Sequence, residues 1–210
     1  MRNKKWLSYG GIVASLVLIA FGIASIVVGA NGRSEVRNDV KREAIVGSAD
    51  MSPKAIKAEA AQAGLKNVPL PSCTVANQAI ETGSQAKCFA SYMRIHTLEA
   101  TGGKTYAEMP RYATADGKGT NDPAVASKSA GGQPLDNPKR DIWVTYTSLT
   151  TALNAGYMAE QMSLFGIVVG VALLLTGVGF LVLALGGALR NPETSIGFVR
   201  KWAGHAQPAA

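Results

Sequence analysis

The sequence predicts an all-α membrane protein in which two transmembrane helices form a hairpin around a disulfide-linked, mainly helical extracytoplasmic domain. Three observations predict it. Only 17% of the 210 residues are charged, well below the usual ~25%. Residues 7–30 and 163–189 contain no Asp, Glu, Lys or Arg, and both cysteines lie between them. Each stretch exceeds the roughly 20 apolar residues that span a bilayer as a helix. An ordinary soluble globular protein is therefore excluded.

The first span, residues 7–30, follows a short basic tail, residues 1–6. Arg2, Lys4 and Lys5 also suit the start of a signal peptide, and residues 28–30 (VGA) form a passable cleavage site. The apolar run is, however, longer than the ~7–15 residues usual for a signal peptide. We therefore favour a retained transmembrane helix and leave cleavage open.

The intervening segment, residues 31–162, shows helix signals in three places. Val36, Val40 and Ala44 recur every four residues, which predicts an outward extension of the first span, with or without a break at residues 31–32. Ser52 and Pro53 predict a helix start, and Gly64 predicts its end. A third helix is expected over residues 85–100, ended by glycines 102 and 103.

Residues 109–139 contain four prolines and several glycines, which predicts a loop. We interpret it as a surface arm or as a segment that a partner orders. After it, Ile142, Tyr146, Leu149, Leu153 and Gly156 alternate spacings of four and three, which is a helical seam. No breaker follows, so one helix is expected over residues 141–189. It includes the second span, 163–189, and its outer part should pack on the Val36 extension.

The basic residues near the span ends predict the orientation. The tail 1–6 carries net charge +3 and the tail 190–210 carries +2, whereas the 132 residues between the spans carry only +2. Both tails are therefore expected in the cytoplasm and residues 31–162 outside, with the whole in the cell membrane. The +7 total reflects topology and attraction to anionic lipid, so we expect no nucleic acid partner. In the last tail, residues 194–203 suit either a short interfacial helix or an unstructured end.

Cys73 and Cys88 are the only cysteines and lie in the predicted external segment, where disulfides persist. A zinc site would need more ligands than His96 alone supplies nearby. The favoured prediction is a Cys73–Cys88 disulfide, which closes a loop of about 15 residues worth about 3 kcal/mol.

Gly166 and Gly170 in the second span predict close helix packing, because small residues four apart let helix backbones approach, and Gly177 and Gly179 extend this smooth face. The partner helix is either the first span, which offers Ala14, Gly22, Ala24 and Gly29, or another chain.

Few residues suggest chemistry. His96 and Glu99 are spaced i, i+3 on the third helix, and with Glu108 they form at most a weak site. A hydrogen-bonded structural histidine is the favoured interpretation of His96. Thr105 and Glu108 match a capping box, and residues 103–105 (GKT) lack the glycine that a phosphate-binding loop requires five residues earlier. We expect no catalytic residue, no metal and no cofactor.

Residues 96–109 (HTLEATGGKTYAEM) and the runs 141–145 (DIWVT), 150–154 (TTALN) and 158–160 (MAE) are distinctive. Together with the spans they resemble a family of small two-span membrane proteins of actinobacteria. The family has no established function, although members are often labelled aromatic ring-opening dioxygenases. Extradiol ring cleavage commonly uses iron held by two histidines and a carboxylate. The predicted membrane separates His96 from His205, the only other histidine, so no catalytic residue is carried over.

The sequence therefore predicts a non-enzymatic accessory or scaffolding subunit of a cell-envelope membrane complex. Its expected partners are the lipid bilayer and either another protein or further copies of the chain. The alternative is a ligand-binding or sensing module that uses the extracytoplasmic domain, with loop 109–139 as the segment that recognises the ligand.

Overall fold

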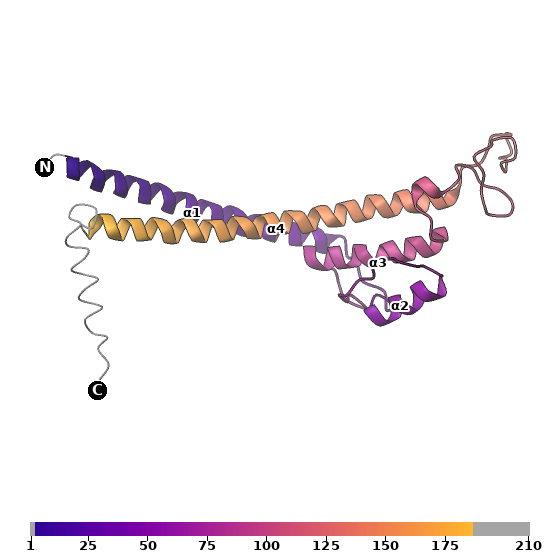
Figure 1. Cartoon of the computed structure of the whole chain (residues 1–210), viewed down its shortest axis with the longest axis horizontal. Helices are drawn as coiled ribbons and strands as arrows, with labels where there is room; N and C mark the ends of the chain where they lie inside the picture. Colours follow the sequence, from indigo (N-terminus) through magenta and orange to yellow (C-terminus); the bar gives the residue numbers. More distant parts are fainter. Residues whose placement is uncertain (1–2, 187–210) are drawn as a thin grey trace, which may run out of the picture. The chain divides into compact units, whose positions relative to one another are not determined.

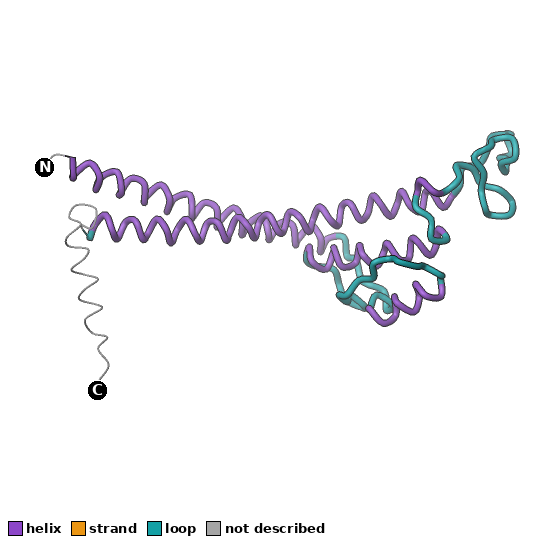
Figure 2. Tube along the Cα trace, in the orientation of Figure 1, coloured by secondary structure: helices purple, strands orange, loops and turns teal. Residues whose placement is uncertain are grey.

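A computed structural model describes residues 3–186 of the chain. Within these residues all regular elements are helices, and they run α1, α2, α3, the 3₁₀ helix η1 and α4 (Figures 1 and 2). The chain divides into two compact units. One consists of Met1–Arg33 and Met162–Ala210 and is called the hairpin unit; the other, Ser34–Gln161, is called the intervening unit.

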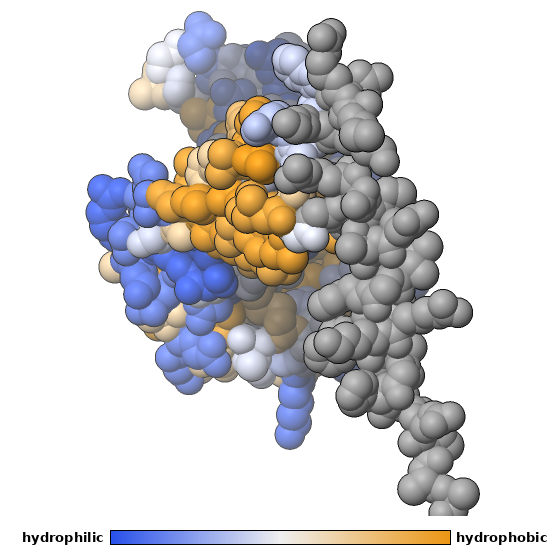
Figure 3. All heavy atoms as spheres, turned by 90° about the vertical axis from the view of Figure 1, so that its left-hand side faces the viewer, coloured by the Kyte–Doolittle hydropathy of each residue, from blue (hydrophilic) through white to orange (hydrophobic). Residues whose placement is uncertain are grey.

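The hairpin unit pairs the first part of α1 (Asn3–Arg42) with the last part of α4 (Pro138–Leu185), which lie side by side (Figure 1). Both helices are long and apolar enough to span a membrane, by length and composition. Large apolar side chains such as Phe21, Phe165 and Leu175 are exposed on these helices, and Figure 3 shows a hydrophobic surface, in orange, at this end of the molecule. The prediction of two long apolar helices is thus confirmed. The expected end at residue 189 and the tail 190–210 lie outside the described residues.

The intervening unit contains α2 (Pro53–Gln62), α3 (Gly83–Thr101), η1 (Tyr106–Glu108) and the remaining parts of α1 and α4. The Ser52 hydroxyl accepts a hydrogen bond from the Ala55 N–H, and Gly64 follows α2 in a left-handed conformation. Thr82 caps α3 through the Gln85 N–H, and Gly102 ends α3 with φ +68°. Both helices therefore begin and end at or within two residues of the predicted positions.

The long connections are held by backbone pairing. Ile80 N–H donates to the Ile45 carbonyl and Gly47 N–H to the Gln78 carbonyl, both at 2.9 Å. Gly47 is required there, because a Cβ atom would lie 2.0 Å from the Val75 carbonyl oxygen. The segment after α1 is thereby fixed against the segment before α3.

The core of the intervening unit forms where α2 and α3 meet these connections and the outer part of α4. Its largest fully buried side chains include Tyr92, Ile95, Ile56, Ile80 and Val75. Leu153 of α4 joins the buried cluster, and Val40 of α1 packs at its edge. The predicted packing of Val40 on the outer part of α4 is confirmed, since it lies against Gly156.

Three details differ from the sequence prediction. α1, which runs through residues 31–32 without the break that the sequence left open, ends at Arg42, so Ala44 lies in a turn, with φ +48°. α4 begins at Pro138, three residues before the predicted start, because the Asn137 side chain accepts a hydrogen bond from the Lys139 N–H. Ile142, at the outer end of the predicted seam, is exposed.

The loop within residues 109–139 is ordered by its own hydrogen bonds. Tyr112 and Thr120 exchange two backbone bonds of 2.9 Å, and Ala113 bonds with both Leu135 and Ser127. At its base, buried Asn137 donates to the Pro110 carbonyl at 2.9 Å, and Arg140 donates to the Met109 carbonyl at 3.1 Å.

Candidate functional site

The predicted packing glycines lie in contact between the two apolar helices of one chain. A Cβ atom on Gly170 would lie 2.7 Å from the Gly22 carbonyl oxygen, and one on Gly177 would lie 2.9 Å from the Ser15 carbonyl oxygen. Gly166 is looser, with its nearest neighbour, the Ser25 carbonyl oxygen, at 3.9 Å. Of the two partners that the sequence left open, the first apolar helix therefore contacts these glycines.

The tightest contacts follow a seven-residue step that the sequence analysis missed. On α4 the step is Ser163, Gly170, Gly177, Ala184, and on α1 it is Ser8, Ser15, Gly22, Gly29. Gly29 faces Ser163, and the Ser8 hydroxyl is 3.4 Å from the Ala184 carbonyl oxygen. Ser15 and Ala184 are buried, whereas many large apolar side chains of the same two helices are exposed. A seven-residue step keeps one helix face against its partner, and the repeat was visible in the sequence.

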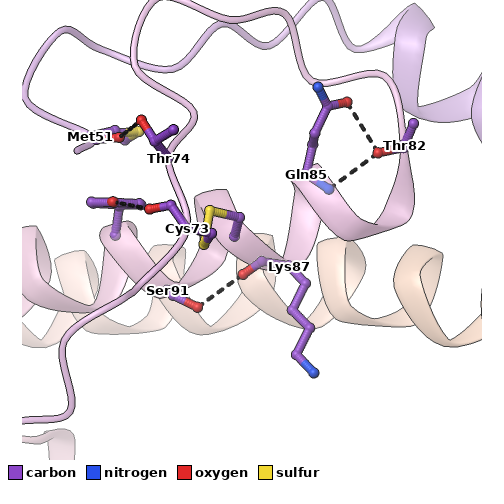
Figure 4. The surroundings of a disulfide bond; sticks show 9 residues. Met51, Cys73, Thr74, Thr82, Gln85, Lys87 and Ser91 are labelled. Atoms are coloured by element: carbon purple, nitrogen blue, oxygen red, sulfur yellow. Dashed lines mark hydrogen bonds between the residues drawn. A yellow bond between two sulfur atoms is a disulfide. The ribbon is translucent and has the colours of Figure 1, made fainter. Parts of the chain in front are cut away.

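Cys73 and Cys88 form the predicted disulfide (Figure 4). It ties the connection after α2 to the first turns of α3, so the prediction is confirmed. The carbonyl of Cys73 accepts a hydrogen bond from the hydroxyl of Tyr92, and Thr74 bonds to the Met51 carbonyl. Burial raises the pKa of Tyr92, which keeps this hydroxyl a donor.

A buried carboxylate, Glu160, fastens three helices within the intervening unit. Its side chain is 4% exposed and pairs with Arg37 of α1 at 2.7 Å. Its other oxygen accepts the N–H of Gly83, at the start of α3, at 2.7 Å. A Cβ on Gly83 would lie 2.7 Å from the Tyr157 Cα, so only glycine permits this approach. The carboxylate satisfies an otherwise unpaired N–H at a helix N-terminus.

An apolar groove of about 450 Å³ lies within the intervening unit, between the outer parts of α1 and α4. Two carboxylates, Asp39 and Glu43, stand on its α1 side. The remaining lining is apolar: Val36, Val40, Ile45, Leu149, Ala152, Leu153, Ala155, Gly156 and Ala159. Its volume falls within the ~300–1,000 Å³ of small-molecule sites.

His96 lies between two carboxylates that the sequence analysis did not connect with it. Its Nε2 is 3.5 Å from an oxygen of Asp50, in the connection before α2, and 3.5 Å from Oε1 of Glu59 on α2. Among the described residues, neither Nε2 of His96 nor Oε1 of Glu59 has a hydrogen-bond partner, and both atoms are shielded from solvent. The hydrogen bond expected for a structural His96 is therefore absent at this nitrogen.

Burial raises the pKa of Glu59 to about 7, and a hydrogen bond with the Glu99 side chain and the charges of Glu99 and Asp50 act in the same direction. Glu99, predicted beside His96 on α3, thus joins the cluster through Glu59. Crowded carboxylates retain protons unless a cation neutralises them.

Glu108 is engaged elsewhere. Its carboxylate accepts bonds from the N–H and hydroxyl of Thr105, at 2.7 and 2.8 Å, which completes the predicted capping box. These bonds lower the pKa of Glu108. The signal for Asp50 and Glu59 was weak in the sequence, because 37 residues separate Glu59 from His96 and only the packing of α2 on α3 joins them.

Comparisons with known proteins add no relative. The predicted resemblance to the actinobacterial family stays a prediction. No protein-family model, curated protein sequence or solved structure matches this chain.

Proposed function

We propose that the chain is an integral membrane protein with both termini in the cytoplasm and residues 31–162 outside. Two apolar helices of candidate span length support membrane insertion. The basic tails support the orientation, because Lys and Arg concentrate on the cytoplasmic side.

Cysteine labelling tests this orientation. Cys73 is exposed and Cys88 is buried, so after mild reduction a membrane-impermeant maleimide should label Cys73 in intact cells. A Cys73→Ser, Cys88→Ser double variant sets the background. Labelling only in permeabilised cells would show the opposite orientation, with residues 31–162 in the cytoplasm.

We further propose that the protein is a non-enzymatic accessory or scaffolding subunit of a cell-envelope membrane complex. The observation that carries this proposal is the apolar groove between the outer parts of α1 and α4. Apolar grooves between helices accept an apolar helix face of a partner, and Glu43 favours a partner with a basic residue beside that face.

Photo-crosslinking in native membranes tests the partner. A photoreactive amino acid at Ala155, which is exposed in the groove, should yield one discrete protein adduct. The same group at Lys118, whose side chain is 86% exposed on the loop, is the matched control and should not. Equal adducts from both positions, or none from Ala155, would count against the scaffold.

A ligand-binding or sensing module is the second candidate, favoured by the volume of the same groove. Ala152→Trp, with the photoreactive amino acid kept at position 155, would fill the groove in either case. A small apolar ligand would then be lost from purified protein, as native mass spectrometry would show. Loss of a protein adduct alone would favour the scaffold.

A further inference from the structure

The cluster around His96 has the composition of a metal site. It brings one imidazole and the carboxylates of Asp50 and Glu59 together, with their ligand atoms within 4.8 Å of one another. The Glu99 carboxyl adjoins Glu59. Three elements supply these groups: the connection before α2, α2 itself and α3. With a neutral imidazole the four side chains carry up to three negative charges.

The distances discriminate between a hydrogen-bonded cluster and a cation site. Nε2 of His96 lies 3.5 Å from each of two carboxylate oxygens, beyond the ~2.7–3.2 Å of an N–H···O bond. Ligands that surround zinc tetrahedrally at ~2.0–2.2 Å are separated from each other by about 3.4 Å. The two separations from Nε2 of His96 therefore match edges of a tetrahedral coordination shell, and all three ligand atoms lie within 4.8 Å of one another.

The burial of the same atoms is the second observation. Nε2 of His96 and Oε1 of Glu59 are shielded from solvent and find no hydrogen-bond partner in residues 3–186. Buried polar atoms without partners are costly and rare in proteins. A cation between them would satisfy both at once.

We propose that Asp50, Glu59 and His96 bind one divalent transition metal ion of the zinc class. Imidazole selects this class over Mg²⁺ and Ca²⁺, which prefer oxygen ligands alone. The ion joins α2 to α3 on elements already linked by the Cys73–Cys88 disulfide. This assignment revises the sequence-based expectation of no metal and does not depend on the proposed scaffold function.

Zinc titration of the purified full chain tests the proposal. The protein is kept in mild detergent with its disulfide intact, stripped with a chelator and dialysed, and Zn²⁺ alone is added in a calorimeter. We expect one equivalent to bind, and Glu59→Gln or His96→Gln to weaken binding at least tenfold. Mg²⁺ at the same concentrations should give no heat of binding.

The other histidine supplies the matched control. His205→Gln removes the same side chain from the tail and should leave zinc affinity unchanged. Circular dichroism establishes that each variant retains its helices, and Glu59→Gln keeps the shape of the side chain if His96→Gln does not fold. Equal zinc binding by the wild type and both cluster variants, or loss in His205→Gln alone, would overturn the proposal.

Discussion

Glu160 is a charged side chain buried where α1, α3 and α4 meet within the intervening unit. Its carboxylate forms an ion pair with Arg37 and accepts a hydrogen bond from the Gly83 N–H. Removing one member of such a set leaves the others buried without a partner, which is the larger part of the cost. The residue therefore fixes which faces of the three helices meet.

We expect Glu160→Gln to lower the free energy of unfolding of the chain by about 2 kcal/mol, because hydrogen bonds to a charged group contribute roughly 1.5–3 kcal/mol. Denaturant titration in detergent, followed by circular dichroism, measures it. Glu81→Gln is the control, since Glu81 forms a half-exposed pair with Lys41 at 3.4 Å and should change stability by under about 1 kcal/mol. Equal effects would contradict the role of Glu160.

Glu108 predicts a pH dependence confined to the turn at η1. Its pKa is lowered by hydrogen bonds from Thr105, so the capping contribution is complete above the ordinary pKa of a glutamate. It is lost as the pH falls through the lowered pKa. The Thr105 amide should therefore lose its protection against hydrogen exchange as the pH falls through this lowered pKa. In Glu108→Gln the protection of the Thr105 amide should no longer depend on this titration. The same pH profile in the variant and the wild type would contradict the prediction.

The hairpin depends on backbone contact between its helices along the seven-residue step. Gly170→Val would place side-chain atoms against the Gly22 carbonyl and the Ile26 N–H, both nearer than 3.0 Å to the Cβ position. We expect a loss of roughly 1–3 kcal/mol or more from overpacking. Thermal unfolding in detergent measures it.

Gly179→Val is the matched control on the same helix, because no atom lies within 4 Å of its Cβ position. It should leave the hairpin intact. Similar losses from both substitutions would mean that helix propensity, and not contact with α1, governs the effect.

The helices themselves were largely predictable, because their ends depend on neighbours in sequence. Ser52, Pro53 and Gly64 bound α2, and Gly102 ends α3.

The cluster at His96 was only half predictable. Its partner Glu99 lies one turn away on α3, whereas Asp50 and Glu59 come from segments that tertiary packing brings close. Glu108 was grouped with His96 in the sequence, and its carboxylate is engaged by Thr105.

At the scale of the whole molecule, the two units depend on different interactions. The hairpin unit packs through small residues and backbone, whereas the intervening unit has a buried core and a disulfide. The sequence predicted this division from the placement of charge and cysteine. The order within the loop was not predictable, because long-range backbone pairs such as Ala113 with Leu135 leave no periodic pattern.

We expect the Cys73→Ser, Cys88→Ser double variant to lose about 3 kcal/mol of stability through the freed loop of about 15 residues. The loss should be confined to the intervening unit. Hydrogen exchange read by mass spectrometry should show faster exchange in peptides of α2 and α3. Peptides from the hairpin unit are the internal control, and faster exchange there as well would contradict the separation.

The hydrogen bonds at the base of the loop, here called the clamp, leave the tip of the loop open to insertions. Asn137 and Arg140 hold the two ends of the loop together. At its tip, Gly131 and Gly132 are exposed and form a turn closed by the bond from Ser129 N–H to the Gln133 carbonyl. An epitope tag or a small fluorescent domain inserted between these glycines would leave the clamp untouched. The same insertion would report, in living cells, on which side of the membrane the loop resides.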